Sequence, residues 1–210
     1  MLLKIQQFYR AIQALKSENL GDYAILKADA FGAKVNPAAE SKLQHVVGYH
    51  PPIDLEKLSH YTKGSFGYEY ARHMQENHLK PFNVSPDLEE IAKRNVFSLR
   101  YVVTHDIFHV LLEFDTSYAG EIGVLAFAAE QNYSPHLKVS LALAKVIYPV
   151  LAPQQIKKIF ANVRTGQELG RKAKFLLGVR FEEYWDRPLN EVKAVLGLTT
   201  DPARLTATAV

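Results

Sequence analysis

The stretch YVVTHDIFHVLLEFDTSYAGEIGVL, residues 101–125, places two histidines, an aspartate and a glutamate in an otherwise apolar helical pattern. Its apolar residues fall on several faces of a helix, which is typical of a helix buried deep in a core. Ionisable groups in such a helix are costly unless they have partners. The stretch therefore predicts both the central helices of the fold and the place of a functional site.

The rest of the chain has the same helical period. At its start, Ile5, Phe8, Ile12 and Leu15 fall three and four residues apart, and glycines and prolines separate the later periodic segments. No run of alternating polar and apolar residues indicates a strand. We expect an all-α fold, with a single multi-helix domain of about eight to ten helices over residues 1–198 and a flexible tail at 199–210.

Several residues predict where individual helices begin, end or bend. Asp54 and Ser85 are expected to cap helix N-termini, because their side chains can accept hydrogen bonds from free backbone amides. Gly64 and Gly67 are expected to separate two helices, Gly166 is a candidate break in a long amphipathic helix, and Pro149 is expected to bend or end a helix.

Composition excludes several classes of protein. The 210 residues include no cysteine, which excludes a disulfide framework, a thiolate metal site and a cysteine nucleophile. The net charge of +3 comes from interspersed lysines and arginines, so no nucleic-acid surface is expected. The N-terminus lacks the features of a signal peptide, and no segment has the roughly 18 unbroken apolar residues of a spanning helix. The expectation is a protein that is soluble or lies on a membrane surface.

Helix geometry brings three of the ionisable groups together. His105 and His109 are four residues apart and therefore neighbours on one face, and Asp106, three residues before His109, borders the same patch. Glu121 lies as far after residue 115, in the turn, as His109 lies before it. If the two helices pack antiparallel, both side chains lie roughly 9 Å from the turn. Axes about 8–10 Å apart would let Glu121 reach the imidazoles.

Two interpretations of this cluster are open. Two imidazoles and two carboxylates suit zinc, ferrous iron or another divalent first-row ion, and a cation would neutralise the buried acids. Alternatively, the residues form a structural hydrogen-bond network, with Glu121 stabilised by the helix dipole. Glu113, four residues after His109, is a candidate to replace one of the acidic ligands, but we expect it to be solvated at the end of the helix. The six other histidines have no partner at a ligand-like spacing, and we assign them no role: His45, His50, His60, His73, His78 and His136.

The pattern His-Asp-x-x-His, followed by eleven residues and Glu, resembles the signature of the fourth coenzyme Q (ubiquinone) biosynthesis protein, the Coq-four family. Here it is carried by His105, Asp106, His109 and Glu121. Two further segments resemble the same family. They are KGSFGYEYARHMQENHL at 63–79 and GQELGRKAKFLLGVRFEEYWDRPLNEVKAVLGL at 166–198.

This resemblance implies an all-α fold and a divalent metal, usually taken as zinc, with iron or magnesium as alternatives. It implies peripheral attachment to membranes and a role on polyprenyl-quinone precursors. The family is associated with replacing the ring carboxyl of a prenylated hydroxybenzoate by hydroxyl, and with organising other quinone-biosynthesis proteins. The chain has no mitochondrial presequence, which suggests a bacterial homologue, located in the cytoplasm and peripherally associated with the inner membrane.

The helices that follow the metal hairpin offer apolar surfaces for a lipid. We expect an isoprenoid tail to run among Leu125, Val139, Leu143 and Ile147, although plain helix packing would give the same pattern. The first helix of the chain is a further candidate for the membrane surface. The leading hypothesis is a metal-dependent enzyme acting on a prenylated aromatic lipid. The alternative is a non-catalytic isoprenoid-binding scaffold with a structural metal, and a homodimer is compatible with either.

Overall fold

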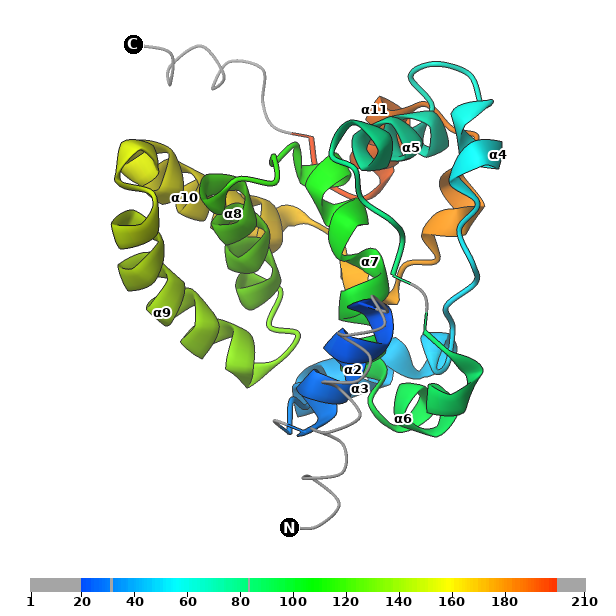
Figure 1. Cartoon of the computed structure of the whole chain (residues 1–210), viewed down its shortest axis with the longest axis horizontal. Coiled ribbons are helices and arrows are strands. Elements are labelled where there is room, and N and C mark those ends of the chain that lie inside the picture. The colour runs from blue at the N-terminus through cyan, green and yellow to red at the C-terminus, as the bar shows by residue number, and fades with distance from the viewer. Residues whose placement is uncertain (1–19, 31, 83, 200–210) are drawn as a thin grey trace.

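The computed structural model describes residues 20–30, 32–82 and 84–199, and these residues form an all-α fold (Figure 1). They contain ten α-helices and five short 3-10 helices, and no β-strand occurs among them. The all-α prediction is confirmed. The predicted first helix and the tail beyond residue 199 lie outside the described residues. The α-helices are α2 (Leu20–Ala30), α3 (Pro37–Glu40), α4 (Leu55–Ser59), α5 (Phe66–Glu76), α6 (Glu89–Arg94), α7 (Val96–Leu112), α8 (Tyr118–Glu130), α9 (Pro135–Leu151), α10 (Ile156–Lys172) and α11 (Leu189–Val195).

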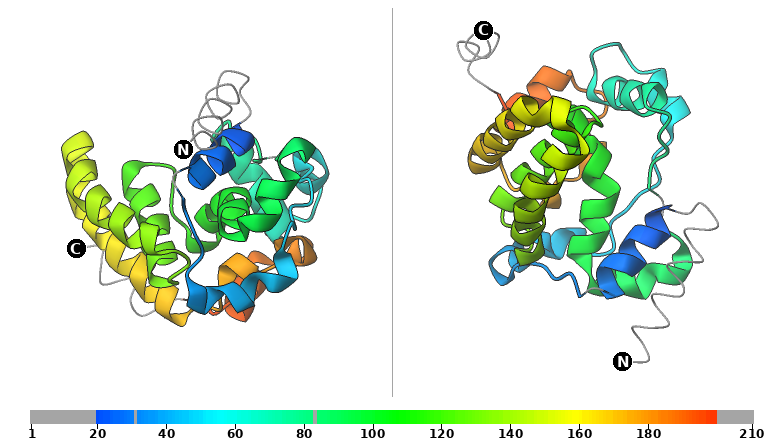
Figure 2. Two further views of the ribbon diagram at one scale, coloured as in Figure 1. Left: turned by 90° about the horizontal axis from the view of Figure 1, so that it is seen from below. Right: turned by 60° about the vertical axis from the view of Figure 1, so that its left-hand side comes forward.

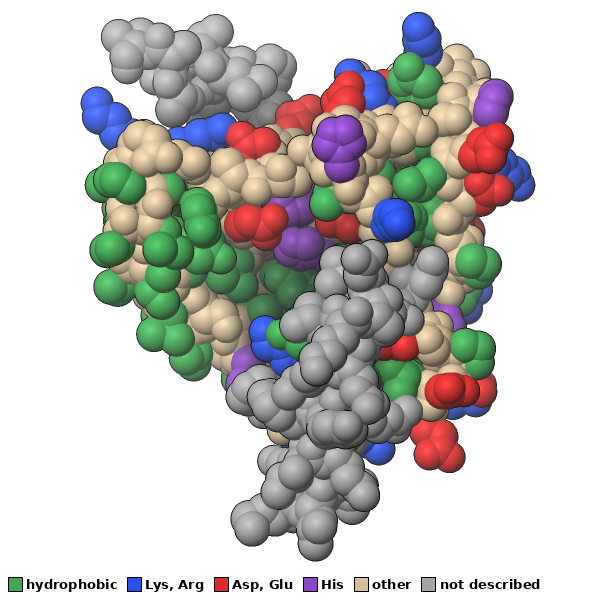
Figure 3. Space-filling view, viewed as in Figure 1, with side chains coloured by type: hydrophobic (Ala, Val, Ile, Leu, Met, Phe, Trp, Pro, Cys, Tyr) green, Lys and Arg blue, Asp and Glu red, His purple; other side chains and the backbone are tan. Residues whose placement is uncertain are grey.

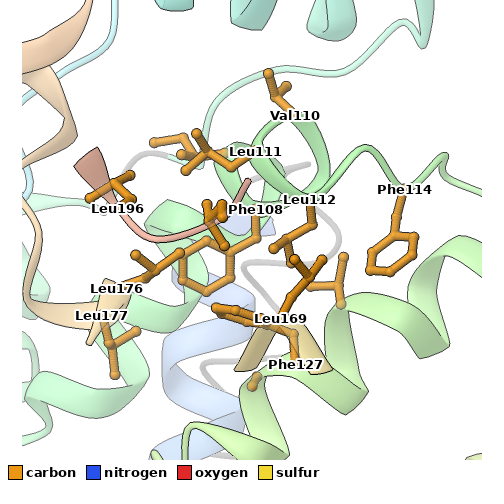
Figure 4. Packing of buried hydrophobic residues seen from close by; sticks show 14 of the residues in the cluster. Phe108, Val110, Leu111, Leu112, Phe114, Phe127, Leu169, Leu176, Leu177 and Leu196 are labelled. Atoms are coloured by element: carbon orange, nitrogen blue, oxygen red, sulfur yellow. The ribbon is translucent and has the colours of Figure 1, made fainter. Parts of the chain in front are cut away.

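Helix α7 is the centre of the fold. It contacts α2, α5, α6 and α8, and its side chains Leu99, Ile107, Phe108 and Leu111 are almost fully buried. Figure 4 shows Phe108 pointing toward Phe127 of α8 and the neighbouring leucines of the main core. Being apolar on several faces, α7 is covered on most of its sides by other helices, as its sequence predicts.

A buried arginine ties α7 to two distant parts of the chain. The guanidinium of Arg100 donates hydrogen bonds to the carbonyl oxygens of Tyr49, Leu177 and Val179, at 2.9, 3.2 and 2.6 Å. Its side chain is fully buried, and its charge is spread over these three carbonyl dipoles. The bonds hold the N-terminal half of α7 against the segments that precede α4 and follow α10.

The second unit of the fold is the set α8, α9 and α10. Figure 2 shows α8 lying between α7 and the α9–α10 pair. The backbones of α8 and α10 approach closely over more of their length than those of any other two described elements, whereas the backbones of α7 and α8 do so at few positions. Large side chains such as Phe108 and Phe127 fill the space between the two helices that carry the candidate site.

Glycines explain the close approach of α10 to α8. A Cβ atom added to Gly166 would lie 2.3 Å from the carbonyl oxygen of Gly123, so only glycine fits there. The prediction of a helix break at Gly166 is wrong, because α10 runs unbroken from Ile156 to Lys172. Gly67 likewise lies inside the first turn of α5, where a Cβ would meet the backbone oxygen of Trp185 at 3.0 Å.

Two of the predicted caps have different outcomes. Asp54 caps α4 by accepting a hydrogen bond from the amide of Lys57, as expected. Ser85 makes no capping bond; instead its amide and hydroxyl both donate to Asp22, at 2.8 and 2.5 Å. A 3-10 turn over Pro86–Leu88 follows, and α6 begins only at Glu89. A tertiary contact with α2 has replaced the local cap.

Proline 149 lies in the last turn of α9, which ends at Leu151. Within the described residues no single helix is long and apolar enough to cross a membrane. Segments Pro135–Leu151 and Pro153–Lys172 meet the length and hydropathy requirement only when taken together, and they are bent by 115°.

The glycine contact between α10 and α8 predicts the effect of a small substitution. We expect Gly166→Ala to lower the free energy of unfolding by about 1–3 kcal/mol, because the added methyl group forces the two backbones apart. This loss should appear despite a gain of about 1 kcal/mol in helix propensity. Urea unfolding followed by circular dichroism measures it, with the exposed neighbour Thr165→Ala as control. Equal stability of Gly166→Ala and the wild-type chain would contradict the packing argument.

Candidate metal centre

Three predicted ligands meet at the apex of the α7–α8 hairpin. His105 Nε2 lies 3.3 Å from Glu121 Oε2, His109 Nε2 lies 3.3 Å from Glu121 Oε1, and the two Nε2 atoms are 3.3 Å apart. One ligand atom from each residue lies within 4.8 Å of the other two. The helix spacing and the hairpin symmetry both placed these side chains correctly.

The turn between the helices fixes this arrangement. Glu113 ends α7 with a left-handed backbone (φ 58°), and the amide of Phe114 bonds back to the carbonyl of His109. Ser117 then caps α8 by accepting a hydrogen bond from the amide of Gly120. Glu121 therefore stands in the first turn of α8, where the helix dipole stabilises its negative charge.

His109 is oriented for ligation by a second hydrogen bond. Its Nδ1 lies 3.0 Å from the carbonyl oxygen of Phe114, and since a carbonyl only accepts, Nδ1 carries the hydrogen. Nε2 is then the ring nitrogen that faces Glu121 and His105, and it can offer its lone pair to a metal ion once it is deprotonated. Metal-binding histidines commonly have such a partner on the other ring nitrogen. The His109 side chain is buried, so this orientation is firmly held.

The spacing of the ligand atoms suits a small divalent ion. A tetrahedral ion about 2.0–2.1 Å from its ligands separates neighbouring ligand atoms by about 3.3 Å. The two imidazole nitrogens, and each nitrogen with its facing carboxylate oxygen, have this separation. With three protein ligands, one coordination position stays open for water or substrate, as in catalytic sites.

The electrostatics of the group also favour a cation. Burial by itself raises the pKa of Glu121, but hydrogen bonds from His105 and His109 outweigh it and lower the pKa to about 2. Burial opposes the protonation of His109, but the bonded Glu121 carboxylate outweighs this effect and raises the pKa of the imidazole. The two groups therefore stabilise each other's charged forms, and a cation at this place would compete with the proton on His109.

Asp106 does not join these three side chains. It is half-buried beside them, and burial raises the pKa of its carboxyl, an effect that the nearby His105 and His109 partly oppose. Its carboxylate lies outside the group of ligand atoms within 4.8 Å of one another, so its role as a fourth ligand stays a prediction. Glu113 is exposed at the helix end and pairs with Lys193 at 2.7 Å, as expected for a solvated acid.

The similarity of the chain to known proteins agrees with this geometry. Residues 49–202 match the family model described as "Coenzyme Q (ubiquinone) biosynthesis protein Coq4". The chain belongs to the Coq4 family. Among curated relatives, it is 31% identical over 159 residues to the mitochondrial ubiquinone biosynthesis protein COQ4 homolog of Rattus norvegicus and 31% identical over 156 residues to that of Homo sapiens. The matches cover 73% and 71% of this chain.

The chain spans little more than half the length of these Coq4 relatives, 57% of the rat protein and 56% of the human protein. A crystal structure of a candidate ubiquinone biosynthesis protein from Nostoc punctiforme has the same fold. It superimposes with a TM-score of 0.66 at 23% identity, covering 95% of this chain and 96% of that one.

Two residues of this Coq4-family site were not predicted from sequence. His73 of α5 stacks on His109, with ring centroids 5.9 Å apart and planes 16° apart, and burial lowers its pKa. Tyr101 of α7 presents its ring edge to His105 at 5.8 Å. The signal for Tyr101 was its position one turn before His105. No spacing rule indicates His73, which comes from a separate helix within the family-like segment 63–79.

The ligand group lies beside a hollow in the molecular surface. Figure 3 shows histidine and acidic side chains next to a depression with hydrophobic side chains below them, between α7 and the α8–α9 unit. Tyr101, Leu125 and Tyr148 are half-buried against the core, and Leu125 lies one turn beyond Glu121 on α8. An apolar wall with aromatic rings thus adjoins the candidate metal position.

The four predicted lipid contacts divide between two places. Leu125 is partly buried against the core, one turn beyond Glu121 on α8, whereas Val139, Leu143 and Ile147 are exposed on α9. The side of α9 that packs on α8 carries Leu141 and other buried residues. Any lipid touched by the three α9 side chains would therefore lie on the outer surface of the helix. Lipid binding at the four residues stays a prediction.

The ligand geometry predicts metal binding by three side chains. We expect about one zinc or iron ion per purified chain and a large loss of metal in His109→Ala, because two remaining ligands hold a divalent ion poorly. Elemental analysis of both proteins measures the effect. Glu113→Gln is the matched control, since it removes a carboxylate at the same turn and should keep its metal. Full metal retention by His109→Ala would remove this residue from the site.

Metal binding should also release protons. Because the pKa of His109 is raised by Glu121, a growing fraction of the imidazole is protonated as the pH falls from about 8 to about 6. The number of protons displaced by each zinc ion should therefore increase over this range. Titration calorimetry in buffers of different ionisation enthalpy measures it. A binding enthalpy that does not depend on the buffer at the lower pH would show that His109 is not a ligand.

Proposed function

We propose that the chain is a metal-dependent protein of polyprenyl-quinone biosynthesis that acts on a prenylated aromatic acid. The observation that carries this proposal is the placement of a two-histidine, one-carboxylate group beside an apolar hollow. Such an arrangement suits a ligand with an anionic head and a hydrophobic tail. The assignment to quinone biosynthesis rests on the names of the Coq4 relatives.

In this proposal His105, His109 and Glu121 hold the ion at the closed end of the hollow. A divalent ion there would act as a Lewis acid toward the phenolate or carboxylate of the ring. Its charge would favour binding of the anionic head group, while the apolar walls exclude water. The hydrogen bond that His109 Nδ1 donates to the carbonyl oxygen of Phe114 keeps the buried imidazole in place throughout.

Two tyrosines are suited to orient the head group. Burial raises the pKa of Tyr101, and the charge of Glu121 raises it further; the same two causes raise the pKa of Tyr148. Both hydroxyls therefore stay protonated near neutral pH and can donate hydrogen bonds to an anionic substrate. The ring of Tyr101, stacked on Phe97 at 5.6 Å, offers a fixed aromatic surface beside the ion position.

If the reaction replaces a ring carboxyl by hydroxyl, it restricts which metal ion can serve at the site. This reaction removes two electrons from the substrate and so needs an oxidant such as O2. Zinc has no redox chemistry, whereas two histidines and one carboxylate are also the ligands of ferrous oxygenases. The identity of the ion therefore separates an oxidative reaction from binding alone.

The alternative is a non-catalytic isoprenoid-binding scaffold, in which the metal is structural. The backbones of α7 and α8 approach each other closely at few positions, which favours it, because an ion would join the two helices directly. In that case the chain would present its lipid to other quinone-biosynthesis proteins.

A turnover assay separates the two functions. We expect protein loaded with ferrous iron, supplied with O2 and a reductant, to convert a prenylated hydroxybenzoate to the hydroxylated, decarboxylated ring, because iron can take part in the oxidation. The zinc-loaded protein and His109→Ala should give none, and mass spectrometry of the product measures it. Saturable binding of the substrate without turnover under any metal would establish the scaffold instead.

A further inference from the structure

Helix α9 is apolar on two opposite sides. One side, with Leu137, Leu141 and Ala144, is buried against the rest of the fold. The opposite side is exposed and continues onto the start of α10. Its exposed large hydrophobic residues range from 41% for Ile156 to 76% for Val150, and they are Val139, Leu143, Val146, Ile147, Val150, Leu151, Ile156 and Phe160.

The exposed residues form a stripe. Val139, Leu143, Val146 and Val150 follow one another at spacings of four, three and four residues, so they lie along one line of the helix. Single exposed hydrophobic residues are ordinary, but a contiguous apolar surface of this kind marks an interaction site. Figure 3 shows hydrophobic side chains gathered over α9, at the left of the molecule. We call this surface the α9 stripe.

The charged residues in the segment that carries the α9 stripe are all basic, although Lys158 at the start of α10 pairs with Asp115 of the turn before α8. Residues 131–167 contain no aspartate or glutamate and carry five cations, which are Lys138, Lys145, Lys157, Lys158 and Arg164. Lys138 and Lys145 are seven residues apart and follow the same edge of the stripe. An apolar helix face with a basic border is typical of helices that lie in a membrane interface.

We propose that the α9 stripe is a docking surface for an anionic membrane. Its apolar side chains enter the boundary between headgroups and acyl chains, and Lys138 and Lys145 meet the lipid phosphates. A second copy of the chain fits this surface less well. A twofold interface would set the same basic, acid-free surface against itself, with no carboxylate from either α9 to neutralise the lysines.

Docking through the α9 stripe would bring the candidate metal centre to the lipid. Tyr148 lies on the inner side of α9, where its ring contacts that of Tyr118 with the ring centroids 5.1 Å apart. Tyr118 is on α8, one turn before Glu121. The helix that meets the membrane therefore also contributes, from its inner side, a side chain next to the ligand group. The docking itself does not depend on the reaction proposed above.

Vesicle co-sedimentation of the full chain tests the proposal. The probes are vesicles of phosphatidylcholine alone and of equal parts phosphatidylcholine and phosphatidylglycerol. The wild-type chain should bind the anionic vesicles, and Val146→Glu should bind them about tenfold more weakly, because a carboxylate in the stripe resists burial and repels the headgroups. Gln75→Glu, the same added charge at an exposed position of α5, should bind like wild type. Lys138→Gln and Lys145→Gln should each weaken binding about fivefold.

Val146 is exposed, so its replacement should leave the thermal unfolding of the chain unchanged, and Val150→Glu provides an independent second variant. Wild-type protein that stays in solution with both vesicle types would overturn the proposal. So would equal binding of Val146→Glu, or equal binding to neutral and anionic vesicles. Concentration-dependent dimers that Val146→Glu abolishes, without vesicle binding, would assign the stripe to a second copy instead.

Discussion

The carboxylate of Glu121, held between two imidazoles, is the interaction on which the architecture of the site depends. It joins α7, the centre of the fold, to α8, which is packed mainly against α10. For the three groups to meet, the chain must reverse within five residues and start α8 in register with α7. A Cβ added to Gly120 would lie 1.7 Å from the carbonyl oxygen of Asp115, so the turn tolerates no side chain there. The backbone of the turn, more than the ligands themselves, sets where the ion position lies.

The fold class and the convergence of His105, His109 and Glu121 could be predicted because they depend on local geometry. Residues four apart share a helix face, and a short hairpin fixes which residues lie opposite each other. The side chain of Asp106 points in a different direction, about 100° around the helix from that of His105. The hairpin that brings Glu121 to the two histidines therefore does not bring Glu121 to Asp106. Closeness in sequence was a poorer guide here than helix phase.

Three features that sequence did not reveal depend on contacts between distant segments. Ser85 has the local pattern of a cap, but Asp22 provides a better partner for both of its donors. Gly166 has the pattern of a helix break, but α8 approaches so closely that glycine is required inside a continuous helix. His73 has no ligand-like spacing, yet α5 stacks it on His109. In each case the partner is far along the chain, and its position follows only from the folded core.

The ligand group has a consequence for folding, because its members are close along the chain. His105 and Glu121 are 16 residues apart, so the loop that joins them closes with little loss of chain entropy. A chain that has lost its core but keeps this hairpin would still offer all three ligands to a metal. An ion stabilises the native state only as far as it binds that state better than the unfolded one. A metal bound here would therefore raise the free energy of unfolding less than a metal bound at a site built from distant segments. If the group binds a metal, the same locality would let the ion be captured before the remaining helices have packed.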